Sequence, residues 1–259
     1  MGHAARPAGI ESGRMNLNFQ AKGQNMFDII AFDADDTLWH NETLYTAALD
    51  GLKGLLAPYA PPEQVAHTLF ETEIRNLACY GYGIKSYALS MIETAIQISA
   101  GKIDGQGVLQ VIGLAKDMLK ANIRLFDHAL QVITRLSAVY PLMLITKGDL
   151  LDQQSKLTRS GLKSYFRCVE IVTDKTPESY AALLERYHID PAHFLMVGDS
   201  LRSDILPVIA LGGCAVHIPY HITWAHEHID LTDEQRQHFY KLDHLGLLPD
   251  LIESLSQAK

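Results

Sequence analysis

The sequence has few cysteines and no long apolar run. Its three cysteines, Cys79, Cys168 and Cys214, lie far apart and form no Cys-x-x-Cys pair, so neither a disulfide framework nor a zinc knuckle is expected. A reducing compartment, the cytoplasm, fits this cysteine usage better. No apolar run approaches the roughly 18 residues that a membrane span needs, so we expect no membrane partner.

Positive charge is also scarce. Lys and Arg total 22 against 30 Asp and Glu, which gives a formal net charge of -8 and a pI of about 5.8. There is no basic stripe, which argues against nucleic acid as a partner. Apolar residues make up 47% of the 259 positions, enough for one large domain or for a core domain with a smaller second one. The oligomeric state stays open.

Residues 1–25 differ in composition from the rest of the chain. They are rich in Gly, Ala, Asn and Gln and lack the apolar centre of a signal peptide. We expect a flexible leader here, with a transit peptide as the alternative.

Short apolar runs that end in polar loops predict five strands. Amphipathic segments between the later runs predict helices over 150–166, 176–189 and 203–213, the second with Thr176 as N-cap and Pro177 as its first residue. Alternating helices and buried strands are typical of a parallel sheet covered on both faces. We therefore expect an α/β fold with a doubly wound, Rossmann-like parallel sheet. The predicted strands span 27–32, 141–146, 168–173, 193–199 and 214–220.

The segment after the first predicted strand departs from this alternation. Residues 41–127 contain amphipathic helical patterns, including 84–99 and 108–120, and no strand signal. We interpret 41–127 as an inserted helical cap domain, with 26–40 and 128–259 forming the catalytic core domain. The first helical pattern places Val65, Leu69, Phe70, Ile74 and Leu77 on one face.

Acidic, hydroxyl and lysine side chains gather at the ends of four predicted strands. In a doubly wound sheet, ligands bind beyond the carboxyl ends of the strands, so these groups should meet at one edge. The three carboxylates of FDADDTLW would repel one another unless something positive lies among them. The groups are Asp33, Asp35 and Asp36 after the first strand, Thr146, Lys147, Gly148 and Asp149 after the second, Lys175 after the third, and Asp199, Ser200 and Asp204 after the fourth.

Phosphoryl transfer is a chemistry that these groups could share. Mg²⁺ binds through one or two carboxylates and a substrate phosphate, and Asp33 and Asp199 would supply those carboxylates. A carboxylate can also attack phosphorus to form an aspartyl phosphate, and a second acid two residues on could protonate the leaving oxygen. Thr146 and nearby backbone amides could hold the phosphoryl oxygens, while Lys175 could neutralise developing charge.

Four stretches, FDADDTL, LMLITKGD, DKTP and MVGDSLRSDI, resemble the four motifs of the haloacid dehalogenase-like hydrolase superfamily in order and spacing. The resemblance covers about residues 27–40 and 128–220, and the helical insert resembles the C1-type cap of subfamily I. It implies that Asp33 is the nucleophile and also binds Mg²⁺. Asp35 would be the general acid/base and would give the metal its backbone carbonyl.

The same resemblance assigns the other motif residues. Thr146 would bind phosphate beside the backbone amides of Lys147 and Gly148, and Lys175 would be the motif-three lysine. Asp199 would be a metal ligand, with Asp204 a nearby metal-site acid and Ser200 a minor neighbour.

Two features depart from the family pattern. The family usually has glycine where Asp36 stands, so we expect Asp36 to turn to solvent or to cap the turn. The usual lysine-proline pair of motif three is Lys-Thr-Pro here, which leaves Lys156 as the alternative to Lys175. Asp149 is interpreted as a turn or capping residue.

Ordinary structural interpretations exist for these residues. Asp33 and Asp35 could form a turn pair at a strand end, Lys175 could be a solvated loop lysine, and Asp204 could stabilise a helix dipole. The recurrence of acids at a second strand end favours a functional site.

The stretch HITWAHEH contains His221, His226 and His228. Their spacing fits no established zinc pattern, and no cysteine is near. We expect a surface loop packed by Trp224.

Substrate choice is expected to come from the insert and from the loop after the first strand. The loop over 79–87 has two glycines and two tyrosines between helices and could reach over the active site, although an ordinary turn is the alternative. The candidate substrate-contacting residues are Trp39, His40, Glu42, Arg75, Tyr82 and Lys85.

An acid at Asp35 fits phosphate ester chemistry, because the dehalogenase and phosphonatase members of the family lack it. We predict a Mg²⁺-dependent phosphatase for a small phosphorylated metabolite. A sugar-phosphate mutase is the alternative and would need a cap that excludes water. A phospho-acceptor signalling domain would not readily take an insert after its first strand. A calcium-binding loop begun at Asp33 would need Gly and Glu where Leu38 and Leu44 stand.

Overall fold

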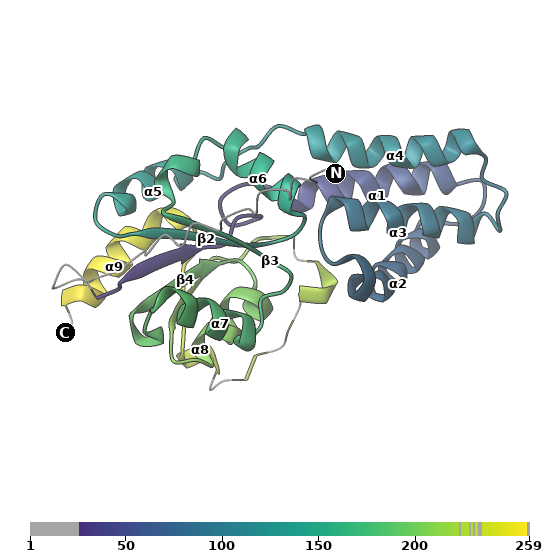
Figure 1. Cartoon of the computed structure of the whole chain (residues 1–259). Helices are drawn as coiled ribbons and strands as arrows, with labels where there is room; N and C mark the ends of the chain where they lie inside the picture. Colours follow the sequence, from purple (N-terminus) through teal and green to yellow (C-terminus); the bar gives the residue numbers. More distant parts are fainter. Residues whose placement is uncertain (1–25, 223, 228, 230, 233–234, 258–259) are drawn as a thin grey trace, which may run out of the picture.

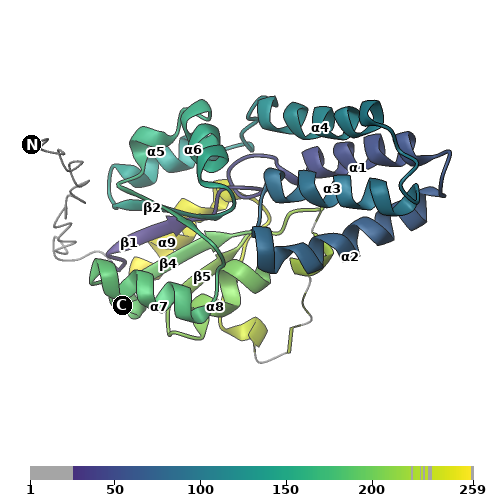
Figure 2. The same ribbon diagram turned by 45° about the vertical axis from the view of Figure 1, so that its right-hand side comes forward.

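The computed structural model describes residues 26–222, 224–227, 229, 231–232 and 235–257. The chain forms a sheet with helices on both faces and, beside it, a group of four long helices (Figures 1 and 2). The leader predicted for residues 1–25 lies outside the described residues. None of the described helices is long and apolar enough to cross a membrane.

A six-stranded parallel sheet forms the centre of the larger part, in the order β3-β2-β1-β4-β5-β6. This confirms the expected α/β, Rossmann-like fold. The sequence missed one strand, β6, which has two exposed residues and is too short to show a periodic pattern. The strands are β1 (Ile29–Phe32), β2 (Leu142–Lys147), β3 (Cys168–Val172), β4 (Phe194–Gly198), β5 (Cys214–His217) and β6 (Tyr240–Lys241).

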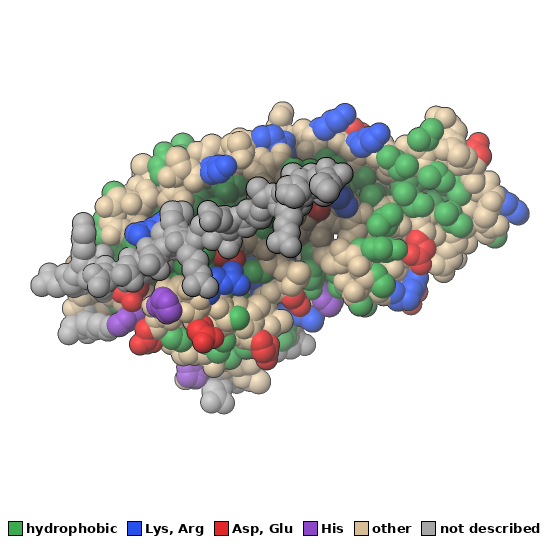
Figure 3. All heavy atoms as spheres, in the orientation of Figure 1, with side chains coloured by type: hydrophobic (Ala, Val, Ile, Leu, Met, Phe, Trp, Pro, Cys, Tyr) green, Lys and Arg blue, Asp and Glu red, His purple; other side chains and the backbone are tan. Residues whose placement is uncertain are grey.

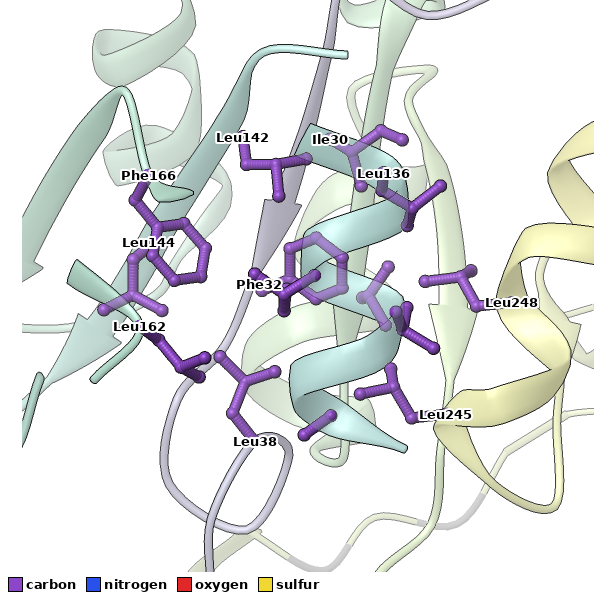
Figure 4. Close-up of a cluster of buried hydrophobic side chains, with 14 of the residues drawn as sticks. Ile30, Phe32, Leu38, Leu136, Leu142, Leu144, Leu162, Phe166, Leu245 and Leu248 are labelled. Atoms are coloured by element: carbon purple, nitrogen blue, oxygen red, sulfur yellow. The ribbon is translucent and has the colours of Figure 1, made fainter. Parts of the chain in front are cut away.

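Alternate residues of β1 face the two helical layers that cover the sheet. Ile30 and Phe32 belong to the hydrophobic core on one face, drawn in Figure 4, and Ile29 and Ala31 belong to the core on the other. Burial on both faces explains why the strands read as continuous apolar runs. The first core packs against α5 (Ala129–Ser137), α6 (Leu150–Arg159) and α9 (Leu248–Gln257), the second against α7 (Pro177–Tyr187) and α8 (Leu206–Ile209).

Local interactions fix where two helices of the sheet domain begin or end. The Thr176 side chain accepts a hydrogen bond from the Ser179 N–H, and the Ser179 hydroxyl accepts one from the Thr176 N–H, so α7 starts with the expected N-cap. The helix predicted over 150–166 is shorter, because α6 ends before Gly161, whose φ of 75° breaks the helical path.

The four remaining helices pack around a hydrophobic core of their own and are called the cap below. The proposed insert boundaries, 41 and 127, lie outside these helices. The predicted apolar face of α2 is wrong in part, because Ile74 is 36% exposed whereas Asn76 is buried. Asn76 Nδ2 donates to Ser90 and to Glu93, which satisfies its buried amide. The helices are α1 (Glu42–Leu56), α2 (Pro62–Tyr80), α3 (Ile84–Ile98) and α4 (Gly105–Lys120).

Two chain segments connect the cap to the sheet, and they are hydrogen-bonded to each other. The His40 N–H donates to Arg124 O, and the Phe126 N–H donates to Leu38 O, both at 3.0 Å. Trp39, between them, is 1% exposed. This pairing holds the two connecting segments side by side.

The molecular surface carries charge of both signs. On the face drawn in Figure 3, Lys, Arg, Asp and Glu side chains are interspersed, and hydrophobic side chains gather toward the cap, on the right of the view. Exposed large hydrophobic residues of the cap include Leu89, Ile96 and Leu109.

Candidate active site

Four strand ends meet at one edge of the sheet, beneath the cap. Asp33 directly follows β1, Thr146 lies near the end of β2, and Asp199 directly follows β4, while Lys175 stands three residues beyond β3. These four residues line a single cavity. The carboxyl ends of strands are where such sheets bind ligands, so the residues expected at separate strand ends share one site.

Lys175 links two of the acids at this edge. Its Nζ lies 2.5 Å from Asp33 Oδ1 and 2.6 Å from Asp204 Oδ1, and all three residues are buried. Buried charges of this kind need partners at hydrogen-bonding distance. Gly198 makes room for the arrangement, since a Cβ at this position would lie 2.3 Å from the Asp204 carboxyl group.

Asp33, Asp199 and Asp204 form a group suited to a hard metal ion. Each offers one carboxylate oxygen, and these oxygens lie within 4.8 Å of one another. Burial raises the pKa of Asp33 to about 7 and that of Asp199 well above its usual range; neighbouring acids add to both shifts, and Lys175 opposes them. One lysine cannot neutralise three carboxylates, whereas a divalent cation with oxygen ligands would, so the donor set fits Mg²⁺.

The Asp35 carboxylate is held by donors from three directions. The indole N–H of Trp39 donates to Oδ1 at 2.6 Å, the Gln153 amide donates to Oδ2 at 3.0 Å, and Lys156 Nζ lies 3.1 and 3.2 Å from the two oxygens. Lys156, the alternative to Lys175, therefore contacts Asp35 and not Asp33. Asp35 still lines the cavity, where a fixed carboxyl group can exchange a proton with a bound substrate.

Asp149 caps a helix as expected, whereas Asp36 binds the start of α1 instead of turning to solvent or capping its own turn. Asp36 has a φ of 61°, in the left-handed region that glycine adopts without strain. Its carboxylate accepts hydrogen bonds from the N–H groups of Asn41 and Glu42 at the start of α1. Asp149 accepts from the Asp152 N–H at the start of α6.

The three predicted phosphate-binding residues all line the cavity, beside a glutamine that sequence reasoning missed. Gln153 Nε2 donates to Thr146 Oγ1 at 2.6 Å and to the Lys147 carbonyl at 2.8 Å. Gly148 adopts a φ of 132°, which a residue with a side chain would rarely adopt. Gln153 sits one turn into α6, so no strand-end signal marks it.

Glu227 is a second residue that the sequence did not single out. Lys147 Nζ lies 2.5 Å from Glu227 Oε1, and the hydroxyls of Ser200 and Ser203 donate to its other oxygen. Burial alone would raise the pKa of Glu227, but Lys147 and the two hydroxyls lower it to about 2. Because Lys147 lies 80 positions away along the chain, no local pattern could reveal the pair.

The segment before Glu227 also reaches the cavity. Trp224, expected to pack a surface loop, packs on His226 with ring centroids 4.8 Å apart and lines the cavity wall. Among the described residues, the one group of His, Cys, Asp and Glu arranged to hold a metal is the aspartate group above. His228 lies outside the described residues.

The cavity has a volume of about 310 Å³ and takes its other wall from the cap. Of the candidate substrate-contacting residues, Glu42 and Tyr82 line it. Trp39 is instead buried against Asp35, and Arg75 pairs with Glu93 on the cap surface. Outside the cavity wall, Lys85 pairs with Asp149 at 2.9 Å, and His40 Nδ1 lies 3.1 Å from the Tyr220 hydroxyl. The cap residues on the wall are Glu42, Tyr45, Thr46, Leu49, Ala66, Leu69, Phe70, Glu73, Leu77, Gly81, Tyr82, Gly83, Ser86 and Tyr87.

Comparison with known proteins agrees with this fold. Residues 27–212 match the family model of the haloacid dehalogenase-like hydrolases. A solved haloacid dehalogenase-like family hydrolase from Xanthomonas campestris is 31% identical and superimposes with a TM-score of 0.81, over 92% of this chain and 95% of that one. The chain therefore belongs to the haloacid dehalogenase-like hydrolase family, which confirms the resemblance. No curated protein matches the chain.

More distant structures share the fold but differ in named activity. One is a predicted phosphoglycolate phosphatase from Haemophilus somnus, 20% identical, with a TM-score of 0.58 over 88% of this chain and 99% of that one. Another is a 2-haloacid dehalogenase from Pseudomonas syringae, also 20% identical, with a TM-score of 0.60 over 89% of this chain and all of that one (100%). Membership of the family thus makes the chain a hydrolase without choosing between ester and halide substrates.

Proposed function

We propose that this protein is a Mg²⁺-dependent phosphatase that hydrolyses a small phosphomonoester through an aspartyl phosphate on Asp33. The observation that carries the proposal is the pair of acids Asp33 and Asp35, which line one cavity in two different settings. Asp33 belongs to the candidate metal group with Lys175, whereas Asp35 is held by neutral and cationic donors away from that group. Two carboxyl groups with different surroundings suit a nucleophile and a proton carrier.

The first half-reaction would transfer the phosphoryl group to the enzyme. A carboxylate oxygen of Asp33 attacks phosphorus, the bond from phosphorus to the leaving oxygen breaks, and Asp35 gives that oxygen its proton. Lys175 lies close enough to Asp33 to neutralise charge on the transferring group. When bound at Asp33, Asp199 and Asp204, Mg²⁺ would neutralise negative charge on the carboxylates and the phosphoryl oxygens.

The second half-reaction would return the enzyme to its starting state. Asp35, now ionised, takes a proton from a water molecule, whose oxygen attacks phosphorus and displaces the Asp33 carboxylate. Inorganic phosphate leaves, and both acids regain their original protonation. Thr146, fixed by Gln153 at 2.6 Å, is placed to hold phosphoryl oxygens during both steps.

The proposed proton transfer by Asp35 also helps to choose between a phosphatase and the alternative activities, a dehalogenase and a mutase. Halide leaves carbon without needing a proton, so a dehalogenase would have no use for Asp35 as a proton donor. A mutase would use the same two acids but would have to keep water from the phospho-enzyme. We favour hydrolysis of an ester small enough for the cavity, with no nucleic acid or membrane as partner.

Phosphate release from a panel of phosphomonoesters tests the proposal, with Mg²⁺ and with EDTA. Asp33→Asn should abolish turnover without unfolding the protein, whereas Asp117→Asn, which changes an exposed acid of α4, should leave it intact. Metal-dependent release that only the first variant loses would support a phosphatase. Release at the wild-type rate by Asp33→Asn would reject the assigned nucleophile, and no release from any ester would reject the phosphatase.

A further inference from the structure

Two acids of the cap face the cavity without a partner. Glu42 opens α1, Glu73 lies in the second half of α2, and both line the cavity wall. Among the described residues, neither carboxyl group accepts a hydrogen bond or forms an ion pair. Burial raises the pKa of Glu73 to about 8, and burial together with the nearby acids Asp36 and Glu73 raises the pKa of Glu42 to about 8. Both residues are partly buried in the cavity wall, where a carboxyl group without a partner is available to bind a group of the ligand.

The positive charges that line the cavity are carried by the sheet domain, although Lys147 Nζ lies 4.3 Å from the ring centre of Tyr82 in the cap. The three lysines of the cavity, Lys147, Lys156 and Lys175, each already contact a carboxylate. No lysine or arginine lines the cap half of the cavity in the described chain. A leaving group with its own negative charge would therefore meet unpaired acids with nothing to offset them.

Aromatic and apolar side chains share the cavity wall with the two acids. The rings of Tyr45 and Tyr87 meet edge to face with centroids 4.8 Å apart, and both line the cavity along with Phe70 and Leu77. The Tyr87 hydroxyl donates to the Tyr45 carbonyl at 3.4 Å. Apolar walls suit a short alkyl chain, and the faces of aromatic rings attract cations.

We infer that the leaving group of the substrate carries an ammonium group, which the carboxylates of Glu42 and Glu73 bind at the cap end of the cavity. The substrate class is then an aminoalkyl phosphate, with its phosphate at Asp33 and its alkyl chain along Phe70 and Leu77. This inference rests on the proposed function, since it places an ester in the same cavity. It makes Glu42 and Glu73 specificity-determining residues.

A bound ammonium group would change the ionisation of the two acids. Asp35 and Asp36 act electrostatically on Glu42, and both cap acids act on the phenols of Tyr45 and Tyr87, whereas Lys156 is already paired with Asp35. A cation among them favours the carboxylate forms, so binding releases protons and strengthens as pH rises toward 8. A neutral polyol would instead bind the protonated acids and weaken over the same range.

The first test compares 2-aminoethyl phosphate with propyl phosphate, which replaces the ammonium group by a methyl group, and with glycerol phosphate. We expect kcat/KM at pH 8 to be at least tenfold higher for the amine ester than for either other ester. Equal values, or a preference for glycerol phosphate, would overturn the inference while the phosphatase stands. If no ester is hydrolysed, 4-nitrophenyl phosphate included, the phosphatase is rejected. The binding measurement described next then tests whether the cavity prefers the ammonium group.

Binding is measured by titration calorimetry of Asp33→Asn with Mg²⁺, in two buffers of different ionisation enthalpy. The amine ester should bind more tightly than propyl phosphate and should release more protons at pH 7. Equal affinity and equal proton release would contradict the inference whatever the activity of the wild type.

A pair of variants locates the recognition. Glu73→Gln should lower the ratio of kcat/KM for the amine ester to that for propyl phosphate at least tenfold. Glu71→Gln makes the same change on the exposed side of α2 and should keep the wild-type ratio. A ratio unchanged by Glu73→Gln, in a protein whose thermal unfolding shows it to be folded, would remove Glu73 from the specificity site.

Discussion

The ammonium nitrogen of Lys175 lies 2.5 Å from the Asp33 carboxylate, with both side chains buried at the strand ends. The same nitrogen lies 2.6 Å from Asp204. Lysine at this position therefore offsets part of the repulsion within the aspartate group before any metal binds. Its removal would leave that repulsion uncompensated in a desolvated site.

We expect Lys175→Met to lose both activity and stability. Removing one partner of a buried pair costs about 3–5 kcal/mol, and losing a charge at the transferring phosphoryl group lowers kcat by roughly 10²–10³-fold. Chemical denaturation with and without Mg²⁺ checks the first effect, because the metal should restore more stability to the variant than to the wild type. An equal gain from Mg²⁺ in both proteins would contradict the proposed repulsion.

Metal binding should depend on pH with a definite sign. Burial raises the pKa of Asp33 to about 7, so below pH 7 the carboxyl group is protonated and must lose its proton before it can bind Mg²⁺. The affinity for Mg²⁺ should therefore fall as pH drops from 8 to 6. Titration calorimetry of the wild type and of Asp33→Asn measures this directly, and the variant should show a smaller dependence. A steeper dependence in the variant would place the titrating group elsewhere.

The sequence brings the candidate catalytic groups together because each stands at a strand end or within three residues beyond it. Apolar runs revealed β1, β2 and β4, and the polar residues that follow them form one site since parallel strands end at the same edge. Such a prediction uses only the local residue pattern and the geometry of a parallel sheet, and not the packing of the helices. The two-residue strand β6 was not predicted because it is too short to show an apolar pattern.

The residues that were missed act through contacts between distant segments. Gln153 lies on α6 and reaches Asp35, more than a hundred positions earlier in the chain. Lys156, which the sequence offered only as the alternative to Lys175, reaches Asp35 from the same helix. Glu227 reaches Lys147 from the segment after β5. The hydrophobic pattern of α2 predicted its buried face incorrectly for a related reason. Asn76 is polar, yet it can be buried because its amide donates hydrogen bonds to two residues of α3.

Glu227→Gln should loosen the segment that carries Trp224. The pKa of Glu227 is lowered to about 2 in the folded protein, so its ionised form contributes stability above the ordinary glutamate pKa. That contribution disappears as pH falls from about 4.5 toward 2. We expect the variant to be less stable than the wild type at pH 7, with the difference shrinking below pH 4. Thermal unfolding across this range measures it; a constant difference would mean that the ion pair with Lys147 is not its source.

Asp35→Asn should separate substrates by their leaving groups. An alkoxide leaves phosphorus poorly unless it is protonated, whereas 4-nitrophenolate leaves readily without a proton. The variant should therefore lose about 10²–10⁴-fold in kcat/KM for an alkyl phosphate and much less in the first release of 4-nitrophenol. Because Asp35 would also activate the water of the second step, the variant should then accumulate phosphate on Asp33. Stopped-flow absorbance and acid-quenched labelling measure the two events. Equal losses for both leaving groups would show that Asp35 does not protonate the leaving oxygen, and its hydrogen bonds with Trp39, Gln153 and Lys156 would then serve only the structure of the site.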